Sequence, residues 1–190
     1  LVLTRLKSLT REQVRSLWHN TYLVKSLFKI LLLTLAFNTY GQERVNFSVL
    51  QDARLAILGD DIGNKPFTED VILRVDMEGN GRRGYISGRL EWEYAALKGG
   101  YYNRISTLGG YNWILGKYIV STHTGPGIIK RTYKKASGGV VAWTVTADLA
   151  YELNDRISFV ASNQIVNRAD VVNEPLRYSF FGGIKMYFNR

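Results

Sequence analysis

The sequence predicts an all-β fold: an eight-stranded antiparallel up-and-down β-barrel that crosses a membrane, preceded by a signal peptide. From Glu43 onward, apolar and polar residues alternate with the period of two that is typical of a strand with one apolar face. Turn residues such as Gly79-Asn80-Gly81 interrupt this alternation at intervals that suit an antiparallel meander. A mean hydropathy of -0.12 excludes a bundle of membrane helices, and 190 residues suffice for one domain with a sizeable core.

Residues 24–41 have the three parts of a secretory signal peptide. Lys25 and Lys29 precede the apolar run Ile30–Phe37, and Thr39 and Gly41 place small residues at the −3 and −1 positions of a cleavage site. The apolar run is far shorter than the roughly 20 residues that a spanning helix needs. We therefore expect cleavage near Gly41, with a retained anchor or a buried helix as the alternative.

Residues 1–23 come before this signal, although a signal peptide normally starts the chain. They could form an amphipathic helix, because Thr10 to Gln13 resembles a capping box. We prefer to interpret them as upstream sequence translated by mistake, since Val24 is what an internal GTG start codon would encode. His19 would then have no function, and residues 42–190 would form the barrel.

The alternating segments define eight expected strands, at residues 46–57, 70–78, 84–96, 101–113, 117–124, 140–153, 156–166 and 176–188. Segment 140–153 alternates most clearly and segment 117–124 least clearly. Tight turns are expected at 79–82, 114–116 and 154–155, and longer links at 59–68, 124–138 and 167–175, with a shorter one near 97–100. The tight turns and both termini then share one side of the barrel, an asymmetry typical of outer-membrane barrels.

The polar faces of these strands carry acidic and basic residues in nearly equal number. A narrow barrel closed in lipid must neutralise its polar interior internally, so we expect these charges to face inward and pair. We interpret them as structural, with a pore or gate as the alternative, because side chains fill the interior of an eight-stranded barrel. The expected interior charge network comprises Asp52, Arg54, Arg74, Asp76, Glu78, Arg89, Glu91, Glu93, Arg104, Asp148, Glu152, Arg177 and Lys185.

The apolar faces carry aromatic residues toward the strand ends, where the girdles of membrane barrels lie. The expected girdle comprises Trp92, Tyr94, Tyr111, Trp113, Trp143, Tyr151 and Phe188. A secreted soluble β-barrel or β-sandwich remains the alternative fold. It would invert the arrangement, with Trp143, Val145 and Leu149 inside and Asp148 outside.

The segment Gly183-Ile-Lys-Met186-Tyr-Phe188 resembles the terminal strand of outer-membrane β-barrels, in which a glycine, an apolar residue and an aromatic residue are read by the barrel-insertion machinery. The chain departs from this pattern in adding Asn189 and Arg190 after the aromatic residue. The resemblance implies a location in the outer membrane of a Gram-negative bacterium. It implies as partners the insertion machinery and outer-membrane lipid, with lipopolysaccharide as a candidate. Strand eight would pair with strand one and leave no free edge.

Few residues suggest chemistry. His123 is the only histidine after residue 41, and with Ser121 nearby but no acid at a suggestive spacing it is expected to be a polar rim residue. Cysteines are absent, and no His, Asp or Glu cluster has metal-ligand spacing, so we expect no cofactor. Of the net charge of +9, residues 1–41 carry more than half, so nucleic acid is not an expected partner.

One basic cluster falls in an expected outer loop, at Lys130, Arg131, Lys134 and Lys135, and could contact phosphates of a surface glycolipid or an anionic partner. We therefore expect a monomeric, non-enzymatic surface barrel with a structural role or an adhesion and interaction role through its outer loops. A small-solute or ion channel is the main alternative, and a lipid-modifying enzyme that uses His123 is the most distant one.

Overall fold

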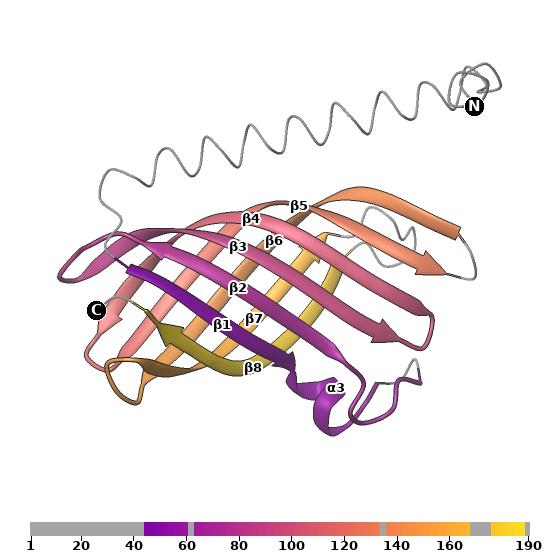
Figure 1. Ribbon diagram of the computed structural model, residues 1–190, viewed down its shortest axis with the longest axis horizontal. Helices are drawn as coiled ribbons and strands as arrows, with labels where there is room; N and C mark the ends of the chain where they lie inside the picture. Colours follow the sequence, from indigo (N-terminus) through magenta and orange to yellow (C-terminus); the bar gives the residue numbers. More distant parts are fainter. Residues whose placement is uncertain (1–43, 61–62, 134–135, 168–175, 189–190) are drawn as a thin grey trace, which may run out of the picture. The chain divides into compact units, whose positions relative to one another are not determined.

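A computed structural model describes residues 44–60, 63–133, 136–167 and 176–188 (Figure 1). The expected signal peptide at 24–41, the extension at 1–23, and Lys134, Lys135, Asn189 and Arg190 lie outside these residues. Within the described ranges, no helix combines the length and the apolar character needed to cross a membrane.

Eight strands form a closed antiparallel barrel in sequence order, which confirms the predicted fold class. The strands are β1 Arg44–Asp52, β2 Asp70–Glu78, β3 Gly84–Leu97, β4 Gly100–Leu115, β5 Tyr118–Tyr133, β6 Ala136–Glu152, β7 Ile157–Asn167 and β8 Leu176–Tyr187. The barrel closes where β8 pairs with β1, with Phe47 opposite Met186 and Leu50 opposite Gly183. We call the end with the turns at 79–83, 116–117 and 153–156 the inner end, and the opposite end the outer end.

The first strand is shorter than predicted. It ends at Asp52, and residues Ala53–Ile57 form a short helix, α3, at the outer end of β1 (Figure 1). The carboxylate of Asp52 accepts a hydrogen bond of 3.0 Å from the Leu55 N–H and caps the helix. The prediction that Arg54 lies inside the barrel is therefore wrong, because Arg54 is exposed on α3.

The predicted loop at 124–138 is also wrong, since β5 continues to Tyr133 and β6 begins at Ala136. Around the middle of β5 the inward residues are Gly125 and Gly127, and the outward residues are Thr124 and Pro126. Neither face is clearly apolar, so hydropathy cannot reveal the strand. The β3–β4 link at residues 98–99 is short, as predicted, but only residues 134–135 separate β5 from β6, so the loop asymmetry between the two ends is weaker than predicted.

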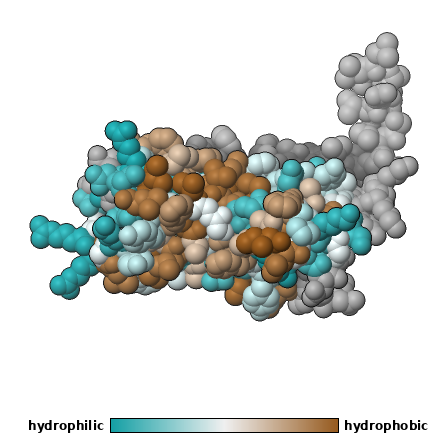
Figure 2. Space-filling model, turned by 90° about the horizontal axis from the view of Figure 1, so that it is seen from below, coloured by the Kyte–Doolittle hydropathy of each residue, from teal (hydrophilic) through white to brown (hydrophobic). Residues whose placement is uncertain are grey.

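The charged side chains lie inside the barrel, beside two clusters of buried apolar residues, and the outer surface is largely apolar. Trp143, Val145 and Leu149 are 52%, 44% and 46% exposed on its outer surface, whereas Asp148 is buried inside. Figure 2 shows apolar side chains across much of one face, between two ends where hydrophilic side chains gather. This orientation excludes the soluble alternative and is that of a barrel crossing a membrane.

Candidate functional site

Eleven charged side chains form one continuous chain of ion pairs through the barrel interior. Acidic and basic groups alternate along it, with no two like charges in sequence. From the inner to the outer end, this interior ion-pair chain runs Glu78, Lys185, Asp76, Arg89, Asp148, Arg74, Glu91, Arg104, Glu93, Arg177 and Asp70.

The inner third of the chain links β8, β2, β3 and β6. Lys185 Nζ lies 2.6 Å from Glu78 Oε1 and 3.4 Å from Asp76 Oδ2. Arg89 Nε lies 2.6 Å from Asp76 Oδ1, and its Nη1 lies 2.6 Å from Asp148 Oδ2. Arg89 therefore bridges two carboxylates on opposite walls, because β3 and β6 are not neighbours.

The middle of the chain holds two fully buried arginines, Arg74 and Arg104. Arg74 lies 2.5 Å from Glu91 Oε2 and 3.3 Å from Asp148 Oδ1. Arg104 pairs with both Glu91 and Glu93. Their remaining N–H groups donate to neutral oxygens, at 3.0 Å from Arg74 to the Ser162 hydroxyl and at 2.7 and 2.8 Å from Arg104 to the hydroxyls of Ser106 and Thr144.

At the outer end Arg177 joins β8 to β2 and β3. Its Nη1 lies 2.5 Å from Glu93 Oε1, and its Nη2 pairs with Asp70. The Arg177 guanidinium also lies over the ring of Tyr102, 4.8 Å from the centroid. Sequence reasoning missed Asp70, although its even spacing from Arg74 and Asp76 along β2 would have placed it on the same inward face.

Two further residues that were predicted to join the interior charge network, Asp52 and Glu152, are not part of the interior ion-pair chain. Asp52 is buried, but its carboxylate caps α3. Glu152 is half-buried at the inner end of β6.

His123 lies inside the barrel and not at its rim, so this part of the prediction is wrong. It is buried on β5 with Nε2 2.7 Å from the Ser87 hydroxyl, which also accepts a bond of 2.6 Å from Asn112 Nδ2. His123 Nδ1 is 3.9 Å from Asp148 Oδ2, beyond hydrogen-bonding distance. Because Ser87, His123 and Asp148 are all buried, this arrangement offers no surface at which a substrate could react.

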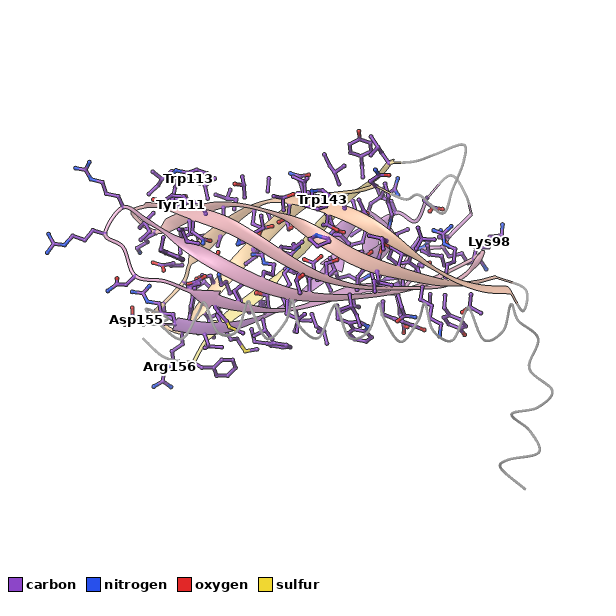
Figure 3. The ribbon with its side chains drawn as sticks, turned by 90° about the horizontal axis from the view of Figure 1, so that it is seen from above. Lys98, Tyr111, Trp113, Trp143, Asp155 and Arg156 are labelled. Atoms are coloured by element: carbon purple, nitrogen blue, oxygen red, sulfur yellow. The ribbon has the colours of Figure 1, made fainter. Side chains whose placement is uncertain are left out.

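The predicted girdle residues all lie on the outer surface, in two groups. Trp92 and Tyr94 stack toward the outer end, with ring centroids 6.2 Å apart. Tyr111 and Trp113 contact edge to face toward the inner end, with centroids 5.0 Å apart. In Figure 3 the latter pair lies toward the end that carries Asp155 and Arg156, and Lys98 lies at the opposite end. Trp143 is exposed on β6, Tyr151 is half-buried at its inner end, and Phe188 is exposed directly after β8.

The described residues of the predicted basic cluster do not lie together on one surface. Lys130 and Arg131 belong to β5 and point to opposite sides of the sheet: Lys130 is exposed, whereas Arg131 lies over the ring of Tyr102 at 5.7 Å. The other two members of the cluster are not among the described residues. In the described part of the chain, no three His, Asp or Glu side chains are placed to hold a metal ion.

Comparison with solved structures identifies the architecture. The outer membrane protein Ail of Yersinia pestis, in a phospholipid bilayer nanodisc, matches with a TM-score of 0.53 and 15% identity over 78% of this chain and 99% of that chain. Ail in complex with the heparin analogue sucrose octasulfate matches with a TM-score of 0.51 and 13% identity over 78% and 99%. This chain has the fold of the small eight-stranded outer-membrane β-barrels. No protein-family model and no curated protein sequence matches it.

We expect this interior to close the barrel to bulk flow. The ion-pair chain crosses from the β2–β3–β4 wall to β6 and β8, so its side chains occupy the space that an aqueous channel would need. Breaking a link would leave buried charges with fewer partners, which is unfavourable. The interior therefore suits a rigid scaffold.

Proposed function

We propose that this protein is a non-enzymatic surface barrel of a Gram-negative outer membrane that takes part in adhesion or interaction through its outer end. The observation that carries the proposal is the contrast between a filled interior and a projecting outer sheet. Ion pairs occupy the lumen, while β5 and β6, with β4 paired along β5 as far as Tyr101 and Thr132, continue beyond the outer end of β7. A scaffold of this kind leaves its outer end as the place for function.

The projecting sheet consists of the β5–β6 hairpin together with β4, which pairs with β5 as far as Tyr101 and Thr132. The last pair between β6 and β7 is Trp143 with Asn167, and β6 extends past it through residues 136–142. In Figure 1 this hairpin reaches beyond the outer ends of β7 and β8. It therefore presents backbone and side chains above the level at which the neighbouring wall ends.

The ligand that best suits this end is a polyanion such as a sulfated polysaccharide. Lys98, in the β3–β4 link, and Lys130, on β5, are both exposed at the outer end. Exposed cations on a rigid sheet attract sulfate or phosphate groups through long-range electrostatics. The structure of Ail with a heparin analogue supports this choice of ligand class for a barrel of the same fold.

Binding of the full-length barrel in nanodiscs to immobilised heparin tests the proposal. The double variant Lys98→Ala/Lys130→Ala should weaken binding several-fold at low salt. The matched control is Arg82→Ala/Arg83→Ala, which removes the same charge from exposed residues at the inner end. Equal binding by both double variants would contradict a cationic site at the outer end. Reduced adhesion of cells that display the outer-end variant would extend the result to the cell surface.

Two further expectations remain proposals of the same kind. The segment Gly183–Phe188 supports recognition by the barrel-insertion machinery, because Phe188 is exposed on the same lipid-facing side as Ile184 and Met186. Cleavage of the signal peptide near Gly41 would deliver residues 42–190 to the outer membrane.

A further inference from the structure

Three large apolar side chains are exposed together at the outer end, apart from the aromatic girdle. Ile57, Leu58 and Phe67 are 70%, 76% and 88% exposed in the connection between β1 and β2. They are neighbours in space as well, because the Phe67 N–H donates to the Ala56 carbonyl at 3.3 Å. We call these three residues the apolar tip. An exposed apolar cluster of this kind usually marks an interaction surface.

The connection that carries the apolar tip is a built structure. The N–H groups of Leu58 and Gly59 both donate to the Arg54 carbonyl, at 2.8 and 3.0 Å. Asn64 is buried, and its side-chain oxygen accepts a bond of 2.5 Å from the Lys98 N–H across the outer end. These bonds hold the tip in one position relative to the strands.

The backbone of Phe67 shows that its exposure has a structural cost. Its φ is 66°, a left-handed conformation that aromatic residues rarely adopt. Such strain persists only where surrounding contacts impose it, and it is common at functional sites. Here the strained residue presents an aromatic ring to the outside.

The apolar tip belongs to a connection that leaves the strands close to the outer girdle. Gln51 points away from the interior, because its neighbours Leu50 and Asp52 are buried inside. Its Nε2 donates to the Thr68 carbonyl at 3.1 Å, so the returning connection passes over the outward side of β1. Gln51 is paired with Val71, and Val71 with the girdle residue Tyr94. The connection therefore starts where the apolar belt of the barrel gives way to its polar end.

We propose that the apolar tip is an interfacial anchor that enters the outer leaflet of the membrane in which the barrel lies. The proposal rests on the outer-membrane location proposed above, and it is favoured by the continuity of the tip with the lipid-facing belt. The exposed cations Arg54 and Lys65 flank the tip and can reach lipid phosphates while the apolar side chains enter the hydrocarbon boundary. The anchor would fix the β1–β2 connection against the membrane and leave the β5–β6 hairpin free above it.

Depth-dependent fluorescence quenching tests this anchor directly. Because the chain has no cysteine, single-cysteine variants can be labelled with an environment-sensitive dye without other changes. Labels at Ile57→Cys and Phe67→Cys are compared with Val145→Cys in the belt and Thr132→Cys near the outermost turn of β5. Each folded barrel is placed in phosphatidylcholine and phosphatidylglycerol vesicles that contain a nitroxide either near the lipid headgroup or along the acyl chain.

The expected result is several-fold stronger quenching at positions 57 and 67 than at 132, with blue-shifted emission. If the labels at positions 57 and 67 were quenched as weakly as the label at 132, while the label at 145 was quenched, the anchor would be overturned and the membrane barrel would stand. That outcome would make the tip available to a protein partner instead. A label at 145 that neither nitroxide quenches would refute the membrane location itself, and with it the anchor.

A second measurement keeps the native tip in place. A label at Lys65→Cys should be quenched when Ile57, Leu58 and Phe67 are all present. Replacing these three residues by serine in the same background should reduce the quenching several-fold, whereas Ile86→Ser, an exposed apolar residue near the inner end, should leave it unchanged. Equal quenching with and without the three side chains would refute their role as the anchor.

Discussion

Replacing Arg89 by alanine should destabilise the folded barrel more than any single change at its surface. Arg89 is buried, and it holds Asp76 through two bonds of 2.6 and 3.3 Å and Asp148 through one of 2.6 Å. Without it, Asp76 keeps only Lys185 at 3.4 Å, and Asp148 keeps Arg74 at 3.3 Å and the hydroxyl of Ser162. Two buried carboxylates would lose their shortest contacts with a cation.

The size of the effect follows from the number of groups left unpaired. Removing one partner of a buried ion pair costs about 3–5 kcal/mol, mainly because the other charge stays buried without compensation. Arg89 compensates two carboxylates, so we expect a loss of free energy of unfolding near the upper end of that range. The remaining contacts of Asp76 and Asp148 prevent the two losses from adding in full.

Urea unfolding in lipid vesicles, followed by the shift between folded and unfolded mobility on gels, measures this loss. Lys130→Ala is the control, because Lys130 is an exposed cation and its loss should change the free energy of unfolding by less than about 0.5 kcal/mol. In the double variant Arg89→Ala/Asp76→Ala the loss should be smaller than the sum of the two single losses. If Arg89→Ala lowered the free energy of unfolding as little as Lys130→Ala, the reasoning that the interior charges depend on each other would be refuted.

On the lipid-facing side, Ala147→Arg near the middle of β6 should lower the free energy of unfolding in vesicles by about 2–4 kcal/mol, and Val145→Arg, nearer the girdle, should lower it less. Equal and negligible effects of the two variants would contradict the assignment of these residues to the lipid-facing side of β6. In planar bilayers the barrel should show no steady single-channel conductance, because the ion-pair chain crosses its lumen, and reproducible steps would favour the channel. Gly127→Val should keep the barrel from reaching its folded gel mobility, whereas Gly109→Ala, whose added Cβ meets no atom within 4 Å, should fold normally. N-terminal sequencing of the membrane-bound protein should begin near Gln42, and a mature chain that retains the apolar run before it would contradict the signal peptide.

The alternation of residues predicts the strands and their faces well wherever the two faces differ in polarity. In β6, Trp143 and Leu149 point outward and Asp148 points inward, as the period of two requires. The same reasoning failed at residues 53–57, because Leu55 and Ile57 fit both a strand of period two and a single helical turn. The difference comes from the Asp52 cap, a local hydrogen bond that hydropathy does not contain.

The sequence also identifies most of the interior charges, but it cannot identify their partners. Arg177 pairs with Asp70, which is 107 positions away in the chain, and Arg89 pairs with Asp148, which is 59 positions away. Any inward arginine could in principle meet any inward carboxylate. The choice depends on the stagger of the strands around the closed barrel, which places β3 across from β6 at the height of Asp148.

One physical cause links the part of β5 that sequence reasoning missed with the polar interior that it predicted. A Cβ at Gly127 would collide with the Ser106 hydroxyl, which accepts a hydrogen bond from Arg104, and a Cβ at Gly110 would collide with the His123 ring. Buried polar side chains such as Ser106 and His123 therefore require glycine at the facing position of the next strand. On β5 this requirement places Gly127 on the inward face, where it contributes no hydropathy signal, so alternation alone predicts a loop in that part of the strand.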